Sequence, residues 1–82
     1  MKYTIDKQEK YSALRLHEEK LDSNVAPQLK SELITLHAEG VNNVILDLSE
    51  VKYTDSSGLS ALLVGNRIMQ EDNGIFVLAC LS

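Results

Sequence analysis

Two short apolar runs constrain the fold of this chain more than any other feature. They span residues 43–48 and 75–81, and polar or turn-forming residues bound each of them. A continuous apolar run of this length is typical of a strand covered on both faces, as in a parallel sheet. Residues 56–72 between the runs have helical spacing, and parallel strands need a connection of a dozen or more residues. The runs therefore predict a right-handed strand–helix–strand unit.

Two more strands are predicted before these runs. Residues 3–9 alternate weakly between apolar and polar side chains, and residues 11–17 alternate clearly, with Leu14 and Leu16 on one face. The two segments meet at Glu9–Lys10. Because so short a connection suits a hairpin, we expect an antiparallel pair.

A first helix is predicted between residues 23 and 40. Ser23 is a good N-cap candidate, Pro27 is tolerated in the first turn, and glycine at position 40 is typical of a residue that ends a helix. The predicted helix has one apolar stripe, formed by Val25, Leu29, Leu33 and Leu36.

A second helix is predicted from Ser56 or Ser57 to about Asp72. One apolar stripe consists of Leu59, Leu62, Leu63 and Met69, and a second, opposite stripe consists of Ala61, Val64, Gly65 and Ile68. A helix that is apolar on two sides is buried twice or meets a partner. One interpretation is that one of these faces contacts a partner beside Ser56, and Val64 and Ile68 are the candidate contacts. The other is that a further segment of the chain covers that face.

Together these elements predict an α/β fold with the order β-β-α-β-α-β. We expect a mixed four-stranded sheet covered by helices, formed as one domain by residues 1–82. The chain stops just after its last strand, whose apolar character calls for a covering helix. Either a C-terminal helix has been lost by truncation, or a partner or second copy covers that surface, as in a homodimer through the uncovered C-terminal edge.

Composition narrows the class of partner. The formal net charge is −4 and the eight basic residues are scattered, so a nucleic-acid partner is not expected. The longest apolar run is too short to span a bilayer, and residues 1–9 do not form a signal peptide. We therefore expect a soluble, cytoplasmic protein with no membrane partner.

No metal or cofactor is expected. Cys80 is the single cysteine, which excludes an intramolecular disulfide, and we expect it in the core. His17 and His37 are far apart, without nearby carboxylates at metal-ligand spacing. The sequence has no phosphate-binding loop of the Walker type and no nucleophile elbow.

The most informative motif runs Asp55-Ser56-Ser57-Gly58-Leu59, where a polar loop opens the second helix. Ser56 lies at or beside the N-cap, so free N–H groups and the positive end of the helix dipole lie under its hydroxyl. Capping alone is one interpretation. The other is a functional site, because the serines follow the carboxyl end of a buried strand and a glycine leaves their hydroxyls accessible.

The sequence resembles the STAS family of anti-sigma factor antagonists. The resemblance rests on residues 44–49, on the motif at 55–59, on Leu21-Asp22-Ser23 and on Asn73-Gly74 before an apolar strand, and it covers nearly all 82 residues. Family members usually continue through another helix, which is absent here.

The resemblance implies a partner-switching function. Ser56 would be phosphorylated by a partner that is both serine kinase and anti-sigma factor, and a serine phosphatase would reset it. The unphosphorylated domain would bind that partner, and the phosphorylated domain would not. The implied partner-binding residues, several of which also serve as candidate helix caps, are Asp22, Ser23, Asp55, Ser57, Gly58, Val64 and Ile68.

Two alternatives belong to other classes. One is a STAS scaffold subunit of a transporter or lipid-trafficking complex, without phosphorylation. The other is a small hydrolase using Ser56, which is the weakest because the sequence places no general base beside that serine. The favoured interpretation is a binding protein rather than an enzyme.

Overall fold

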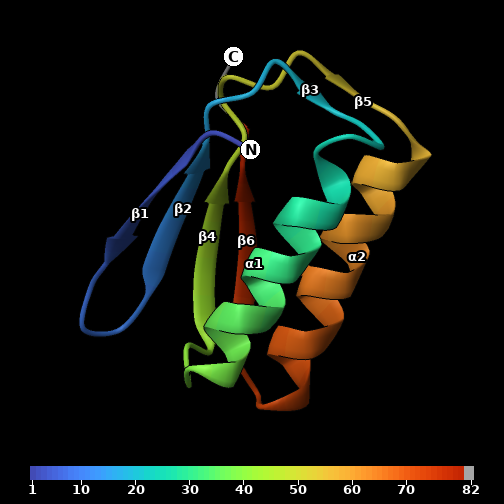
Figure 1. Ribbon diagram of the computed structural model, residues 1–82. Coiled ribbons are helices and arrows are strands. Elements are labelled where there is room, and N and C mark those ends of the chain that lie inside the picture. Colours follow the sequence, from blue (N-terminus) through green and yellow to red (C-terminus); the bar gives the residue numbers. More distant parts are fainter. Residues whose placement is uncertain (81–82) are drawn as a thin grey trace.

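The computed structural model describes residues 1–80, with a four-stranded sheet and two helices packed against one of its faces (Figure 1). The elements of these two layers are β1 (Tyr3–Lys7), β2 (Ser12–Leu16), α1 (Ala26–Ala38), β4 (Asn43–Asp47), α2 (Ser56–Glu71) and β6 (Ile75–Ala79). The predicted order of strands and helices is confirmed. Leu81, the predicted end of the last strand, lies outside the described residues.

The strands of the main sheet lie in the order β1-β2-β4-β6. β1 and β2 are antiparallel, whereas β2 with β4 and β4 with β6 are parallel. This is the predicted mixed sheet. The parallel pairs require crossovers, and α1 and α2 supply them on the same face of the sheet (Figure 1).

Alternating side chains of the strands form one side of the core. Leu14 in β2 pairs with Leu46 in β4, and Leu46 pairs with Leu78 in β6. Leu14 and Leu46 are fully buried, while Arg15 on the opposite face of β2 is exposed. The predicted stripe of α1 completes this core, since all four of its members are buried: Val25, Leu29, Leu33 and Leu36.

The start of α1 differs from the prediction that Ser23 caps it. Val25 is the N-cap residue, and no side chain caps the helix. The Asp22 carbonyl accepts hydrogen bonds from the N–H groups of Val25 (3.1 Å) and Ala26 (2.7 Å). These are the groups that a Ser23 hydroxyl would have reached, so the turn leaves it nothing to cap. The end of α1 is as predicted, with Gly40 at a φ of 92° just beyond it.

The stripe predicted from Leu59, Leu62, Leu63 and Met69 is wrong. Met69 is fully buried, but Leu59 is 53% exposed and Leu63 69% exposed. The buried face of α2 consists of Gly58, Ala61, Gly65 and Met69. A Cβ on Gly65 would lie 2.8 Å from Leu33 of α1 and 2.9 Å from Phe76 of β6. Small residues therefore select the packed face, because they let α2 approach its neighbours closely.

A separate two-stranded sheet was not predicted. β3 (Lys20–Leu21) pairs in parallel with β5 (Tyr53–Thr54) above the carboxyl ends of β2 and β4 (Figure 1). Each strand has only two residues, which is too short for a periodic pattern. This pair joins the segment before α1 to the segment before α2.

β6 is an edge strand within the described residues. Among them it pairs only with β4, and its Ile75, Val77 and Leu78 are 60%, 46% and 44% exposed. Cys80, which we expected in the core, is also exposed. It follows the last paired residue of this edge strand, where no described element covers it.

Candidate functional site

Ser56 is exposed and is the first residue of α2. The segment before it is held by backbone hydrogen bonds to β3 and its neighbours. The Glu19 carbonyl accepts from the N–H groups of Lys52 (2.7 Å) and Tyr53 (3.1 Å), and the Leu21 carbonyl accepts from Asp55 N–H (3.4 Å). The two-stranded sheet of β3 and β5, called the mini-sheet below, therefore fixes where the chain enters α2.

Asp55 is the N-cap of α2. Its backbone is extended, and its carboxylate Oδ1 accepts a hydrogen bond from Gly58 N–H at 3.1 Å. The capping interpretation of Asp55 is confirmed. Its contact with a kinase remains a prediction.

Gly58 serves close packing. It is buried, and a Cβ built on it would lie 2.2 Å from Thr54 Oγ1 and 2.4 Å from the Leu21 carbonyl oxygen. A side chain at this position would push α2 away from the mini-sheet. The sequence suggested that Gly58 opens access to the serines, but the structure gives a different reason for the glycine.

Ser56 borders a groove of about 610 Å³ between the N-terminal turns of α1 and α2. The two helices lie side by side with their N-termini at the same end of the molecule (Figure 1). The residues that line this groove, called the interhelix groove below, are Ser23, Ala26, Pro27, Lys30, Ser31, Ile34, Ser56, Ser57 and Ser60. Two of the predicted partner-binding residues, Ser23 before α1 and Ser57 in α2, therefore line the same groove as Ser56.

The remaining candidates lie elsewhere. Asp22 lines a different hollow, with Glu18 and Glu19, and its carboxylate accepts a hydrogen bond from Asn24 N–H at 3.0 Å. Ile68 is half-buried and packs against the core, and Val64 is half-buried. The structure thus separates Asp22, Val64 and Ile68 from the interhelix groove.

An apolar hollow on the other side of α2 escaped the sequence prediction. It measures about 410 Å³ and is lined by Leu59, Leu62, Leu63, Asn66, Phe76 and Leu78. The recurrence of small residues at positions 58, 61 and 65 is the signal that could have revealed it, since that row marks the packed side of the helix.

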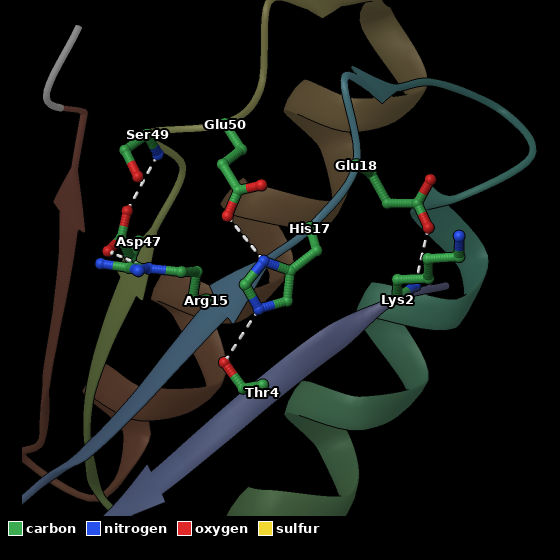
Figure 2. Close-up of polar contacts among 8 residues, drawn as sticks. All are labelled: Lys2, Thr4, Arg15, His17, Glu18, Asp47, Ser49 and Glu50. Atoms are coloured by element: carbon green, nitrogen blue, oxygen red, sulfur yellow. Dashed lines mark hydrogen bonds and ion pairs between the residues drawn. The ribbon is translucent and has the colours of Figure 1, made fainter.

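A polar network on the outer face of the sheet is a second feature that sequence reasoning missed (Figure 2). Arg15 Nε donates to Asp47 Oδ2 at 2.9 Å, and Ser49 N–H donates to Asp47 Oδ1 at 2.9 Å. The hydrogen bonds from Ser49, together with the nearby Arg15 guanidinium, lower the pKa of Asp47 to about 2. The network therefore fixes the chain as it leaves β4.

His17 extends this network on the same face. Its Nδ1 lies 2.6 Å from Glu50 Oε2, and its Nε2 lies 3.1 Å from Thr4 Oγ1 (Figure 2). Beside it, Lys2 N–H donates to Glu18 at 2.6 Å. The His17 contacts join β1 and the end of β2 to the loop that leads from β4 toward the candidate site, whereas the Lys2 contact joins the segment before β1 to the segment after β2.

The described residues also bear on three other classes of site. In the part of the chain that the structure describes, no group of three His, Cys, Asp or Glu side chains is placed to hold a metal ion. Neither α1 nor α2, the two helices within residues 1–80, is long and apolar enough to cross a membrane. The described lining of the interhelix groove includes no His, Asp or Glu that could act as a general base for Ser56.

The sequence of this chain is similar to those of known proteins. Proteins of Staphylococcus epidermidis named anti-sigma-B factor antagonist are 35% identical over 60 residues, which is 71% of this chain and 55% of theirs. The chain thus spans about half the length of the curated relatives it matches.

Solved structures with the same fold include two forms of one protein. The anti-sigma factor antagonist SpoIIAA in its unphosphorylated form superposes with a TM-score of 0.82, and SpoIIAA of Bacillus, a cell fate determinant, in its phosphorylated form with 0.81. Both are 22% identical, over 99% of this chain and 74% of theirs. The family model of the STAS domain matches residues 2–82 of this chain. The chain therefore belongs to the STAS domain family.

Proposed function

We propose that this protein is an anti-sigma factor antagonist that works by partner switching. With Ser56 free, it binds an anti-sigma factor that is also a serine kinase, which releases a sigma factor. Phosphorylation of Ser56 ends the complex, and a serine phosphatase restores it. The observation that carries this proposal is the exposed Ser56 hydroxyl at the first position of α2, on a segment held by the mini-sheet. The names of the Staphylococcus relatives support it.

Ser56 is a better kinase substrate than Ser57. Ser56 is exposed, whereas Ser57 is half-buried between the helices. A kinase must reach the hydroxyl oxygen with a bound nucleotide, and an exposed first residue of a helix allows that approach. Ser57 instead belongs to the surface that surrounds the phosphorylated group.

The fold tolerates a phosphate at this position. A phosphate adds about −1.5 to −2 charges. The α2 N-terminus favours an anion by roughly 0.3–1 kcal/mol. Asp55, the nearest carboxylate in the sequence, is engaged with Gly58 N–H. The new charge therefore acts on the partner, whose surface was shaped for a neutral hydroxyl and now meets repulsion and lost solvation.

The partner surface is proposed to centre on Ser56. Ser57 and Ser23 flank it in the interhelix groove, and Asp55 and Gly58 fix its geometry. Asp22, Val64 and Ile68 are further proposed contacts, although they lie outside the groove. The exposed Leu59 and Leu63 add apolar surface on the same helix.

In this proposal the protein acts by binding, in the cytoplasm, and not as an enzyme. A homodimer through the open β6 edge is compatible with it. The alternative, an unphosphorylated scaffold subunit of a transporter or lipid-trafficking complex, predicts a stable complex that does not depend on Ser56.

Incubation with the cognate serine kinase and ATP, followed by intact-mass measurement and site mapping, tests the proposal. We expect one phosphate on Ser56 in the natural sequence and in the control variant Ser57→Ala, and none in Ser56→Ala. Absence of phosphate on Ser56, together with stable binding to a transporter subunit, would favour the scaffold.

A further inference from the structure

Among residues 1–80, Lys30 is the one charged residue that lines the interhelix groove with Ser56. It lies in the second turn of α1, and its side chain is half-buried. α1 and α2 pack side by side from their N-termini onward (Figure 1). Lys30 therefore shares the groove with three residues from the first two turns of α2, which are Ser56, Ser57 and Ser60. The groove thus places the Lys30 ammonium on the same surface as Ser56, the residue that is phosphorylated in the proposed function.

Lys30 has no carboxylate partner among residues 1–80. The lysines and arginines that form ion pairs there are Lys7, Arg15 and Lys52. No Asp or Glu belongs to the described lining of the groove, and the Asp55 carboxylate accepts from Gly58 N–H instead. The lysine charge is therefore free to meet an anion that enters the groove.

We propose that Lys30 binds the phosphate carried by Ser56, across the groove between α1 and α2. This inference rests on the proposed function and adds the group that receives the modification. A lysine ammonium binds phosphate as a point charge, and the phosphomonoester offers three acceptor oxygens. The hydroxyls of Ser57 and Ser60, which line the same groove, are donors for the remaining oxygens.

The bridge has a structural consequence. It ties the first turn of α2 to α1, so phosphorylation tightens the helix pair and leaves the fold in place. It also draws the phosphate into the groove, where it occupies the surface that the partner would cover. Lys30 then acts as a positioning residue for the phosphate and has no role in transferring it.

The test uses the chain with phosphoserine installed at position 56 during translation, so that no kinase is needed. Titration followed by ³¹P NMR gives the second pKa of the phosphate. We expect this pKa to be lower in the natural sequence than in Lys30→Gln by about 0.5 to 1 pH unit, because an opposite charge favours the dianion. Lys30→Arg should keep the lowered value.

Arg67→Gln is the matched control. It removes an exposed cation from α2, the helix that begins at Ser56. Arg67 lies about 16 Å along the helix axis from Ser56, which is beyond the screening length at physiological salt. It should leave the phosphate pKa unchanged. Equal values in the natural sequence and in a folded Lys30→Gln would overturn the inference.

A second measurement covers the case in which Lys30→Gln does not fold. In a short phosphoserine peptide of residues 54–60, 1 M salt lowers the phosphate pKa because it favours the dianion. In the phosphorylated natural sequence salt also screens the attraction of Lys30, so it should lower this pKa by less than in the peptide, or raise it. An equal response in domain and peptide would also overturn the inference. A kinase that ignores Ser56 would contradict the proposed function alone, because the phosphate here is installed without it.

Discussion

The Thr54 hydroxyl donates a hydrogen bond to the Leu21 carbonyl oxygen at 3.0 Å, beside Gly58 in the first turn of α2. The same two oxygens are the closest neighbours that a Cβ on Gly58 would meet. β3, which is distant in the sequence, therefore meets β5 and the start of α2 at one contact. The position of Ser56 follows from this contact.

The variant Gly58→Ala should destabilise the protein. The added Cβ would meet Leu21 O at 2.4 Å, and backbone cannot move aside as a flexible side chain can. We expect a loss of about 1–3 kcal/mol in the free energy of unfolding, as for overpacking in a core. Urea denaturation measures it. Ser60→Ala, at an exposed position of the same helix, is the control and should change stability by less than about 0.5 kcal/mol. A Gly58→Ala variant as stable as this control would contradict the close approach.

The variant Ser56→Glu should weaken the complex with the anti-sigma factor without unfolding the chain. A few kcal/mol of lost binding energy corresponds to a fall in affinity of about a hundredfold or more. Titration calorimetry gives the affinity, and thermal unfolding gives the stability. Gln70→Glu, which adds the same charge at the exposed far end of α2, should bind normally. Unchanged affinity of Ser56→Glu would count against the switch.

The stability contributed by Asp47 should depend on pH. Its pKa is about 2 in the folded protein, against 3.8 as its ordinary value, so the carboxylate stabilises the fold above about pH 4. This contribution is lost as pH falls through the folded-state pKa. Solvent reaches the half-buried Ser49 and Asp47 as well as the exposed Arg15 and weakens all of these contacts, so we expect about 1 kcal/mol.

Denaturation of the natural sequence and of Asp47→Asn at pH 6 and at pH 2 measures this contribution. The two should differ at pH 6 and approach each other at pH 2. Ser49→Ala, which removes one of the donors to Asp47, should lose part of the same contribution. A difference between the natural sequence and Asp47→Asn that stays constant over this range would show that the carboxylate charge is not the cause.

The sequence predicted the main sheet and the two helices because each leaves a periodic signal. The runs at 43–48 and 75–81 predicted parallel strands, and the stripe of α1 is buried as expected. The mini-sheet could not be predicted, because strands of two residues have no period. Ser23 failed as a cap because the Asp22 carbonyl already takes the N–H groups that it would bind.

The candidate site was predicted only in part, because only some of its features are local in the sequence. The motif at 55–59 located Ser56 at a helix start, which is a local property of the chain. The meeting of Ser23, Lys30 and Ser56 in one groove depends on how α1 packs against α2, and no local pattern contains it. The lowered pKa of Asp47 likewise depends on Arg15 of a neighbouring strand as well as on Ser49.

A pair of truncations tests which face of α2 is packed. Met69 is fully buried and Leu63 is 69% exposed, although their side chains are alike in size. Met69→Ala removes buried contacts and leaves a cavity, so it should lower the free energy of unfolding by about 2–5 kcal/mol. Leu63→Ala removes a side chain that water already surrounds, and alanine favours helix, so it should change stability by less than about 0.5 kcal/mol. Urea denaturation of both variants decides the matter. Equal losses would mean that α2 is rotated about its axis, and Ser56 and Lys30 would then no longer share the interhelix groove.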